Sequence, residues 1–171
     1  NDSSDTTSTD SLLNELVEGK DYFTNLRPKD KADNVGDIYS SDGFQIDEAP
    51  PSTGEVNDGV ADDVDFSESS TTIGVNWTGF DDNESGISHY LVSLGTTSGG
   101  EEVRQPVDVG DVKNYIFSEL YLDHGVTYYS SVTAVDSAGN KSEIVSSDGF
   151  DVDIYPGPPS VIESLPSSEI F

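Results

Sequence analysis

The sequence contains neither cysteine nor methionine. Without cysteine, the chain can form no disulfide, no thiolate metal site and no cysteine nucleophile. The lack of methionine, even at position 1, predicts a mature or excised piece rather than a primary translation product. We find no apolar run long enough to span a membrane and no signal-peptide pattern, so we expect no membrane insertion.

Basic residues are scarce as well. The chain has 7 Lys and Arg residues against 34 Asp and Glu residues, which gives a formal net charge of −27. A basic footprint is needed to bind phosphates, so nucleic acid and anionic membrane surfaces are excluded as partners. A chain this acidic repels itself unless salt or bound cations screen the charge. We expect a calcium-rich extracellular medium or a high-salt habitat, with plain solubility as the alternative.

Histidine is limited to His89 and His124. The strand pattern places His89 at a solvent-facing position. His124 falls in the loop before strand F, at the end of the predicted domain opposite the acidic residues 81–84. Neither pairs with a plausible nucleophile, and no glycine-rich phosphate loop precedes a helix. Because catalysis by a triad needs a nucleophile, a base and an orienting group together, we predict no catalytic residue and no enzyme activity.

The stretch from residue 120 to residue 150 predicts two consecutive β-strands. Tyr128, Val132 and Ala134 fall on one face at a period of two residues. A turn signal, Asp-Ser-Ala-Gly-Asn, begins at Asp136, and a second strand opens at Ile144. Hydrophobic residues make up only 33% of the chain, which is enough for the thin core of a sandwich.

The Leu-x-x-Gly-x-x-Tyr arrangement that ends at Tyr128 resembles the approach to strand F of a fibronectin type III module. Trp77 and Tyr90 fall where that family has its strand B tryptophan and strand C tyrosine. A longer pattern, NW-x-GF-x-x-x-ESGI-x-x-Y followed by LGTTSGG and SDGF, resembles a variant common in secreted, multi-repeat bacterial surface proteins. The resemblance covers residues 50–153 and implies an all-β, antiparallel, seven-stranded sandwich at an extracellular or cell-surface location.

An internal repeat precedes this region. Tyr22 aligns with Tyr128 at an offset of 106 residues (128 − 22), and the run SSDGF at 40–44 recurs at 146–150. The same offset joins further pairs: Leu16 and Leu122, Gly19 and Gly125, Asp30 and Asp136, Asn34 and Asn140, and Ile38 and Ile144. A fixed period of one module's length predicts a tandem array.

We therefore divide the chain into four parts. They are an acidic polar leader (1–15), the F and G strands of one module (16–48), a complete module (49–155), and a linker with the first strand of a further module (156–171). Within the complete module we expect a turn-rich acidic loop at 56–65. Strands are expected at 71–77, 88–94, 101–109 and 112–120, before strands F and G.

Calcium is the predicted cofactor. Asp81-x-Asn83-x-Ser85-Gly86 has the spacing of the first half of a calcium loop, in which alternate oxygen side chains point inward. In a fibronectin-like sandwich the B–C and F–G loops lie at the end where strand A enters. The predicted ligands are Asp81, Asp82, Asn83, Glu84, Asp136 and Asp47. The alternative is a solvated acidic loop.

Two further groups are weaker candidates. A second acidic cluster is expected in the A–B loop at the opposite end of the module, and it consists of Asp58, Asp62, Asp63 and Asp65. Asn-x-Ser/Thr triplets make glycosylation candidates of Asn76, Asn83 and Asn140. Such triplets also arise by chance in a chain this rich in serine and threonine.

Two functions remain open at this point. The first is a non-catalytic structural repeat of an extracellular fibre, stalk or adhesin. The alternative is an accessory module that binds carbohydrate or another ligand, with surface glycans as partners. Tyr115, Tyr121 and Tyr129 are the candidate binding aromatics. A binding module should show coplanar exposed aromatics on one sheet, whereas a spacer should show acidic clusters at its ends.

The two ends of the chain suggest strand exchange. The apolar residues of the tail are Val161, Ile162, Leu165, Ile170 and Phe171. We expect this tail to pair with the half-module or an open sheet edge of a neighbouring copy, which would give a head-to-tail filament. The alternative is a fragment of a longer tandem array, whose adjacent modules would cover the same surfaces.

Overall fold

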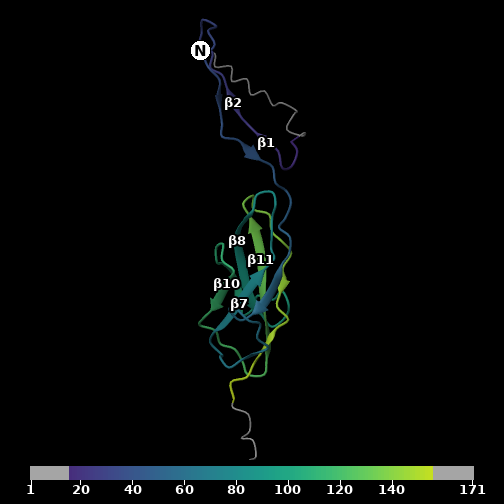
Figure 1. Ribbon diagram of the computed structural model, residues 1–171. Coiled ribbons are helices and arrows are strands. Elements are labelled where there is room, and N and C mark those ends of the chain that lie inside the picture. The colour runs from purple at the N-terminus through teal and green to yellow at the C-terminus, as the bar shows by residue number, and fades with distance from the viewer. Residues whose placement is uncertain (1–15, 156–171) are drawn as a thin grey trace, which may run out of the picture.

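A computed structural model describes residues 16–155 of the chain, and within them all regular secondary structure is β. Figure 1 shows two parts along one long axis: an N-terminal β-hairpin and a larger sandwich, joined by an extended linker. Within residues 16–155, no helix has the length and hydrophobicity needed to cross a membrane.

The smaller sheet of the sandwich has three antiparallel strands. Its strands are β5 (Glu55–Asp58), β7 (Ile73–Thr78) and β10 (Asn114–Phe117), in the order β10-β7-β5. The central strand β7 alternates buried and half-buried residues, because one face lies on the core and the other meets solvent.

The larger sheet is built around β11 (Thr127–Asp136), which pairs antiparallel with β8 (Ile87–Gly95) on one side. On its other side lie two short strands, β12 (Val145–Ser146) and β13 (Phe150–Val152). β9 (Arg104–Asp108) extends the sheet beyond β8, and β6 (Phe66–Ser67) pairs in parallel with β13. Apart from the parallel pair of β6 and β13, this two-sheet arrangement is antiparallel and forms a fibronectin type III-like sandwich, as predicted.

Three details differ from the sequence-based expectation. Residues 55–58 form strand β5, not part of an acidic loop, because Val56 packs inward and its backbone pairs with Trp77. The predicted strand G is interrupted between β12 and β13, where Gly149 has a positive φ of 99°. Strands β9 and β10 are also shorter than the segments predicted for them.

The core lies between the two sheets and is built around aromatic rings. Trp77 from β7 and Tyr90 from β8 lie with ring centroids 5.3 Å apart, and Phe80 meets the same tyrosine edge-on at 5.8 Å. The predicted core is confirmed, since all its members are buried in one cluster: Trp77, Tyr90, Val92, Leu122, Tyr128, Val132 and Phe150.

The E–F corner has the geometry that the resemblance implied. The Tyr128 hydroxyl accepts a hydrogen bond from the Asp123 backbone N–H at 2.9 Å, and Leu122 is buried beside it. Gly125 adopts a φ of 74° and its N–H reaches the Val152 carbonyl at 2.8 Å. The corner therefore fixes where β11 begins, and with it the register of the larger sheet.

The N-terminal hairpin pairs residue for residue as strands F and G of the sandwich do. It contains β1 (Asp21–Tyr22), β2 (Asn25–Leu26), β3 (Tyr39–Ser40) and β4 (Phe44–Gln45). β1 pairs with β4 and β2 with β3, in the registers in which β11 pairs with β13 and β12. The Tyr22 hydroxyl also accepts a backbone N–H, from Val17, as Tyr128 does from Asp123.

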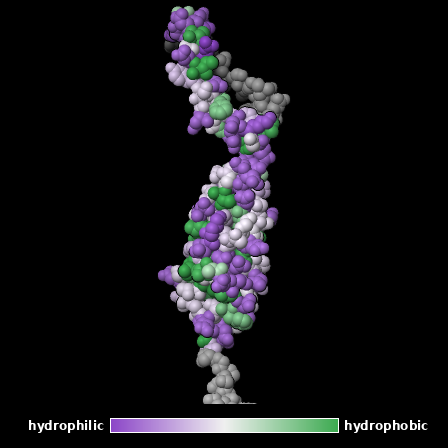
Figure 2. Space-filling model, in the orientation of Figure 1, coloured by the Kyte–Doolittle hydropathy of each residue, from purple (hydrophilic) through white to green (hydrophobic). Residues whose placement is uncertain are grey.

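The two copies differ in what covers them. Val132 and Phe150 of the sandwich are both 0% exposed, whereas the equivalent Leu26 and Phe44 of the hairpin are 67% and 49% exposed. Figure 2 shows apolar residues on the hairpin surface among a mostly hydrophilic exterior. Within residues 16–155, no other strand covers the apolar face of the hairpin.

Replacing Trp77 with Ala should destabilise the sandwich by about 3–5 kcal/mol, because it removes a large side chain from a closed core. Chemical denaturation followed by tyrosine fluorescence measures the change. Tyr121→Ala is the control, because that side chain is 95% exposed and its loss should stay within about 0.5 kcal/mol. A cost below about 1 kcal/mol for Trp77→Ala would show that β7 does not anchor the core.

Candidate metal site at the module junction

The linker between hairpin and sandwich is tied down at the end where it enters β5. The Ser52 N–H donates to the Asp81 carbonyl at 2.8 Å, which joins the linker to the B–C loop. The Asn140 side-chain amide donates to the carbonyls of Asp47 and Ala49 at 3.1 and 3.3 Å, which joins the linker to the F–G loop. Two loops of the sandwich therefore hold one short stretch of linker.

The B–C loop is organised around Asp82. One oxygen of its carboxylate, Oδ1, accepts the backbone N–H groups of Ser85 and Gly86 at 2.9 and 2.7 Å. Gly86 has a φ of 76°, which closes this turn. The turn holds the Asp82 carboxylate on the side of the loop that faces the linker.

The F–G loop places Asp136 at the end of β11, where only 2% of the residue is exposed. Its carboxylate accepts the Asn140 backbone N–H at 2.8 Å and the Asn140 side-chain amide at 2.9 Å. Burial raises the pKa of Asp136, but the Asn140 side chain and the backbone N–H groups of the turn outweigh it, and the pKa is lowered. Asp136 is therefore a carboxylate held in its charged form.

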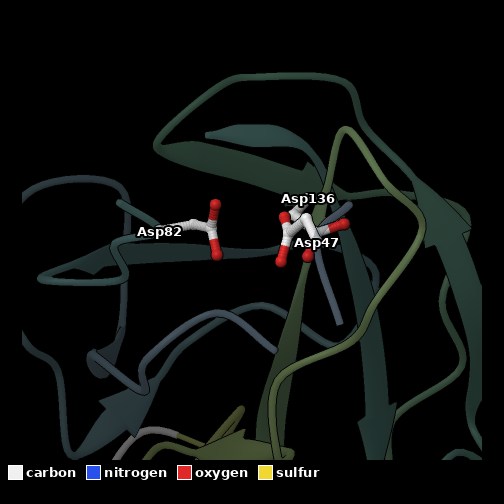
Figure 3. A group of neighbouring side chains, drawn as sticks. All are labelled: Asp47, Asp82 and Asp136. Atoms are coloured by element: carbon white, nitrogen blue, oxygen red, sulfur yellow. The ribbon is translucent and has the colours of Figure 1, made fainter. Parts of the chain in front are cut away.

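The carboxylates of Asp47, Asp82 and Asp136 converge at this junction. One oxygen from each lies within 4.8 Å of the others. Figure 3 shows Asp82 directed across the gap toward Asp136 and Asp47, which lie side by side. One Asp47 oxygen, Oδ2, and the Ser85 hydroxyl are buried there without a hydrogen-bond partner. The site therefore gathers oxygen atoms whose hydrogen-bonding capacity is unused.

No cationic side chain balances this group among the residues that the structure describes. The ion pairs within residues 16–155 involve other acidic residues: Asp33, Asp108, Asp111 and Asp153. Carboxylates this close repel one another, and the repulsion grows where water is partly excluded. The arrangement suits a bound cation with a preference for oxygen ligands.

The structure brings together three of the six residues predicted as ligands. Asp81 and Glu84 are exposed and lie outside the cluster, and Asn83 is exposed as well. The spacing argument placed Asp81 and Asn83 inward, but the loop turns around Asp82 instead, since Asp82 accepts both N–H groups of the turn. The site is thus assembled from three separate segments and is no half of a continuous calcium loop.

The structure separates the three glycosylation candidates. The Asn76 amide donates to the Gly59 and Ala61 carbonyls at 3.1 and 3.4 Å, so this side chain holds the A–B loop and is not free to point outward. The Asn140 amide is engaged at the junction. Asn83 has an exposed side chain and is the candidate whose geometry leaves room for a glycan.

The three tyrosines considered for carbohydrate binding do not share a surface. Tyr115 lies in β10 of the smaller sheet, where it packs edge-on against Phe117 at 5.2 Å. Tyr129 lies in β11 of the larger sheet, and Tyr121 lies in the loop between these two strands. These residues therefore form no common aromatic platform.

Comparison with known proteins gives similarities of fold. No protein-family model and no curated protein match the sequence. Among solved structures, the FN1–FN3 domains of chicken CNTN1 are 17% identical, with 80% of this chain and 44% of that chain covered and a TM-score of 0.43. Domains from titin are 20% identical, with 68% of this chain covered and a TM-score of 0.42.

A further match is the fibronectin type III domain of a human fibronectin type III domain containing protein. It is 22% identical, with 67% of this chain and 97% of that chain covered and a TM-score of 0.38. The aligned part of this chain spans 37% of the titin chain.

In the absence of divalent ions, replacing Asp82 with Asn should stabilise the chain. Asparagine keeps an oxygen to accept the two N–H groups of the turn, but it removes one of three repelling charges. Unit charges at about 4 Å interact with roughly 1 kcal/mol in a water-like medium, so a gain of this order is expected. Thermal unfolding in EDTA measures it, with the exposed neighbour Asp81→Asn as the matched control. Equal changes in both variants would contradict a specific repulsion at the cluster.

Proposed function

We propose that this chain is a non-catalytic structural module of an extracellular or cell-surface array, whose junctions are stiffened by calcium. The observation that carries the proposal is the convergence of Asp47 from the linker with Asp82 and Asp136 from two loops of the sandwich. An ion held by all three would join the linker to the module that follows it. The angle between successive modules would then depend on calcium.

Calcium fits the chemistry of these ligands. The cluster offers carboxylate oxygens and no nitrogen or sulfur ligand, a donor set that hard cations prefer. Calcium accepts irregular oxygen shells of six to eight ligands, which backbone carbonyls and water can complete, whereas magnesium demands a near-ideal octahedron. An irregular site built from a linker and two loops therefore favours calcium over magnesium.

The repeat supports an array. Asp30 and Asn34 of the hairpin make the same pair of hydrogen bonds as Asp136 and Asn140, at 2.9 and 2.8 Å. Asp153 follows Asp47 at the offset of the repeat, so the linker aspartate also recurs. Each repeat would contribute an F–G loop to the junction before it and a linker aspartate to the junction after it.

The accessory-module alternative has less support. The cluster at the junction contains no histidine or nucleophile, and the three candidate tyrosines lie on different elements. A surface that binds polysaccharide without charged groups or a metal needs aromatic rings that stack on the sugar. The three tyrosines do not supply such a surface together.

Calcium should raise the melting temperature of the chain, because an ion that binds only the folded state stabilises it by mass action. At a free concentration of about 100 times Kd the gain is roughly 2.7 kcal/mol. Asp82→Asn should lose the part of this gain that comes from the junction site, and Asp81→Asn should keep it. Isothermal titration with calcium chloride, followed by EDTA, measures binding and its reversal.

The stiffening has a readout of its own. Because the chain contains no cysteine, spin labels can be attached at two introduced sites, Lys31→Cys in the hairpin and Tyr121→Cys in the sandwich. Calcium should narrow the distribution of distances between the labels, and the Asp82→Asn variant should stay broad. A chain that takes up no calcium at millimolar concentration would overturn the proposal.

A second candidate function rests on the exposed face of the hairpin. Leu26 and Phe44 occupy positions that are buried in the sandwich, and an isolated pair of strands is marginal in water. We propose that the tail of a neighbouring copy, residues 161–171, adds a strand to this hairpin and covers that face. These tail residues lie outside the part of the chain that the structure describes. The contact joins two different surfaces, so repetition would build an open filament.

Deleting residues 161–171 should reduce the assembly to monomers, since it removes the strand that the hairpin would receive. Sedimentation velocity of the full chain and the truncated chain at matched concentration measures this. The result to expect is a concentration-dependent larger species for the full chain alone. A truncated chain that assembles to the same size would rule out tail exchange, and a full chain that stays monomeric would favour coverage by adjacent modules of an array.

A further inference from the structure

A second group of carboxylates lies within the sandwich, centred on Asp58 of β5. This residue is 0% exposed. One of its oxygens, Oδ1, accepts the Ser130 hydroxyl at 2.6 Å, but the other, Oδ2, is buried and accepts no hydrogen bond. A buried carboxylate oxygen without a partner is costly unless a proton or a cation neutralises the group.

Two further aspartates face it from different segments. Asp63 folds back from the A–B loop and accepts the Asp58 backbone N–H through its own Oδ1 at 3.1 Å. Asp148 lies in the SSDGF run, in the interruption between β12 and β13. One carboxylate oxygen from each of Asp58, Asp63 and Asp148 lies within 4.8 Å of the others.

This placement corrects the second acidic cluster expected from the sequence. Asp58 belongs to a strand and not to the A–B loop, because Val56 and Asp58 alternate inward along β5. Asp62 and Asp65 have exposed side chains outside the group, and Asp148 takes their place. The group lies where β5 of the smaller sheet contacts β11 and β12 of the larger one.

The group can be reached from solvent. A surface pocket of about 330 Å³ is lined by Asp63 and Asp148 together with residues of β5 and β12, so solvent reaches two of the three carboxylates. Asp63 and Asp148 are exposed on this side, while Asp58 is buried and does not line the pocket, although one of its carboxylate oxygens lies within 4.8 Å of theirs. The site therefore has a buried anchoring ligand and two ligands at its mouth.

The surroundings of Asp58 disfavour its charged form. Burial raises its pKa to about 6, against the lowering effect of the Ser130 and Ser147 hydroxyls, and Asp63 and Asp148 add to the rise. The buried Asp58 carboxylate faces two more carboxylates, with one oxygen of each within 4.8 Å of the others. A cation at this position would satisfy the free oxygen and remove the repulsion together.

We propose that Asp58, Asp63 and Asp148 form a second binding site for a hard divalent cation, calcium, within the sandwich itself. The ion would join β5 of the smaller sheet to the interrupted strand G of the larger sheet and so hold the two sheets together at their shared edge. This site uses none of the residues of the junction site. In this proposal the exposed Asp148 of the SSDGF run at 146–150 is a ligand of the ion.

The test is calcium titration of the full chain in a background in which the junction site is weakened. The Asp82→Asn variant should still bind calcium. Adding Asp148→Asn to it should weaken the remaining affinity at least tenfold, while adding Asp65→Asn should leave it unchanged. Asp148 and Asp65 are both exposed aspartates, so the control removes the same charge from a comparable position.

A further readout and a second variant separate this site from the junction. Amide chemical shifts of Ser130 and Ser147, followed by NMR during the titration, should move in the Asp82→Asn chain and stay fixed once Asp148 is replaced. Asp63→Asn, also exposed, is a second variant in case Asp148→Asn alters the turn. If the Asp82→Asn chain binds no calcium, or if its affinity survives both Asp148→Asn and Asp63→Asn, the proposal is overturned. Because those outcomes leave the binding of the unmodified chain untouched, they do not decide the junction site.

Discussion

The structure depends on the pairing of β11 with its neighbours. Its inward residues, among them Val132 and Ala134, fill the core, while its backbone pairs with β8 and both parts of strand G. The Tyr128 corner fixes its beginning, and its last residue is Asp136 at the junction. Midway, Ser130 donates to Asp58. The register of one strand thus positions the core and both carboxylate groups.

Negative charge is the second constraint. In a chain with 34 acidic and 7 basic side chains, most carboxylates remain in water and repel weakly. The two groups described here differ because the fold takes one member of each out of water, Asp136 in one and Asp58 in the other. Burial strengthens electrostatic interactions of either sign, so these groups gain most from a bound cation.

The two buried carboxylates, Asp136 and Asp58, have pKa values shifted in opposite directions. Asp136 has its hydrogen bonds supplied by its own turn, which keeps its pKa below the ordinary value. Asp58 lacks a partner for one oxygen, and burial raises its pKa. The same residue type is therefore held in its charged form at the junction, whereas inside the sandwich its surroundings favour the neutral form.

Local sequence carried most of the information about the strands. The repeat of residues 16–48 at 122–154 predicted two equivalent segments, and the hairpin pairs in the registers of strands F and G. The alternation in β7 and β11 and the corner at Tyr128 identified the sandwich and its core. These features could be predicted because alternating burial along a strand and turns that need glycine both depend on residues close together in the sequence.

The sequence by itself determined the class of fold, the core residues and the loops that meet at the junction. Tertiary structure decided which carboxylates face one another. Of the two predicted neighbours Asp81 and Asp82, only Asp82 lies in the group, because its carboxylate accepts the backbone N–H groups that close the turn of the B–C loop. Asp148 joins Asp58 because two sheets pack together at one edge. Which carboxylates lie together depends on contacts between segments far apart in the sequence, and residue spacing along the chain does not specify those contacts.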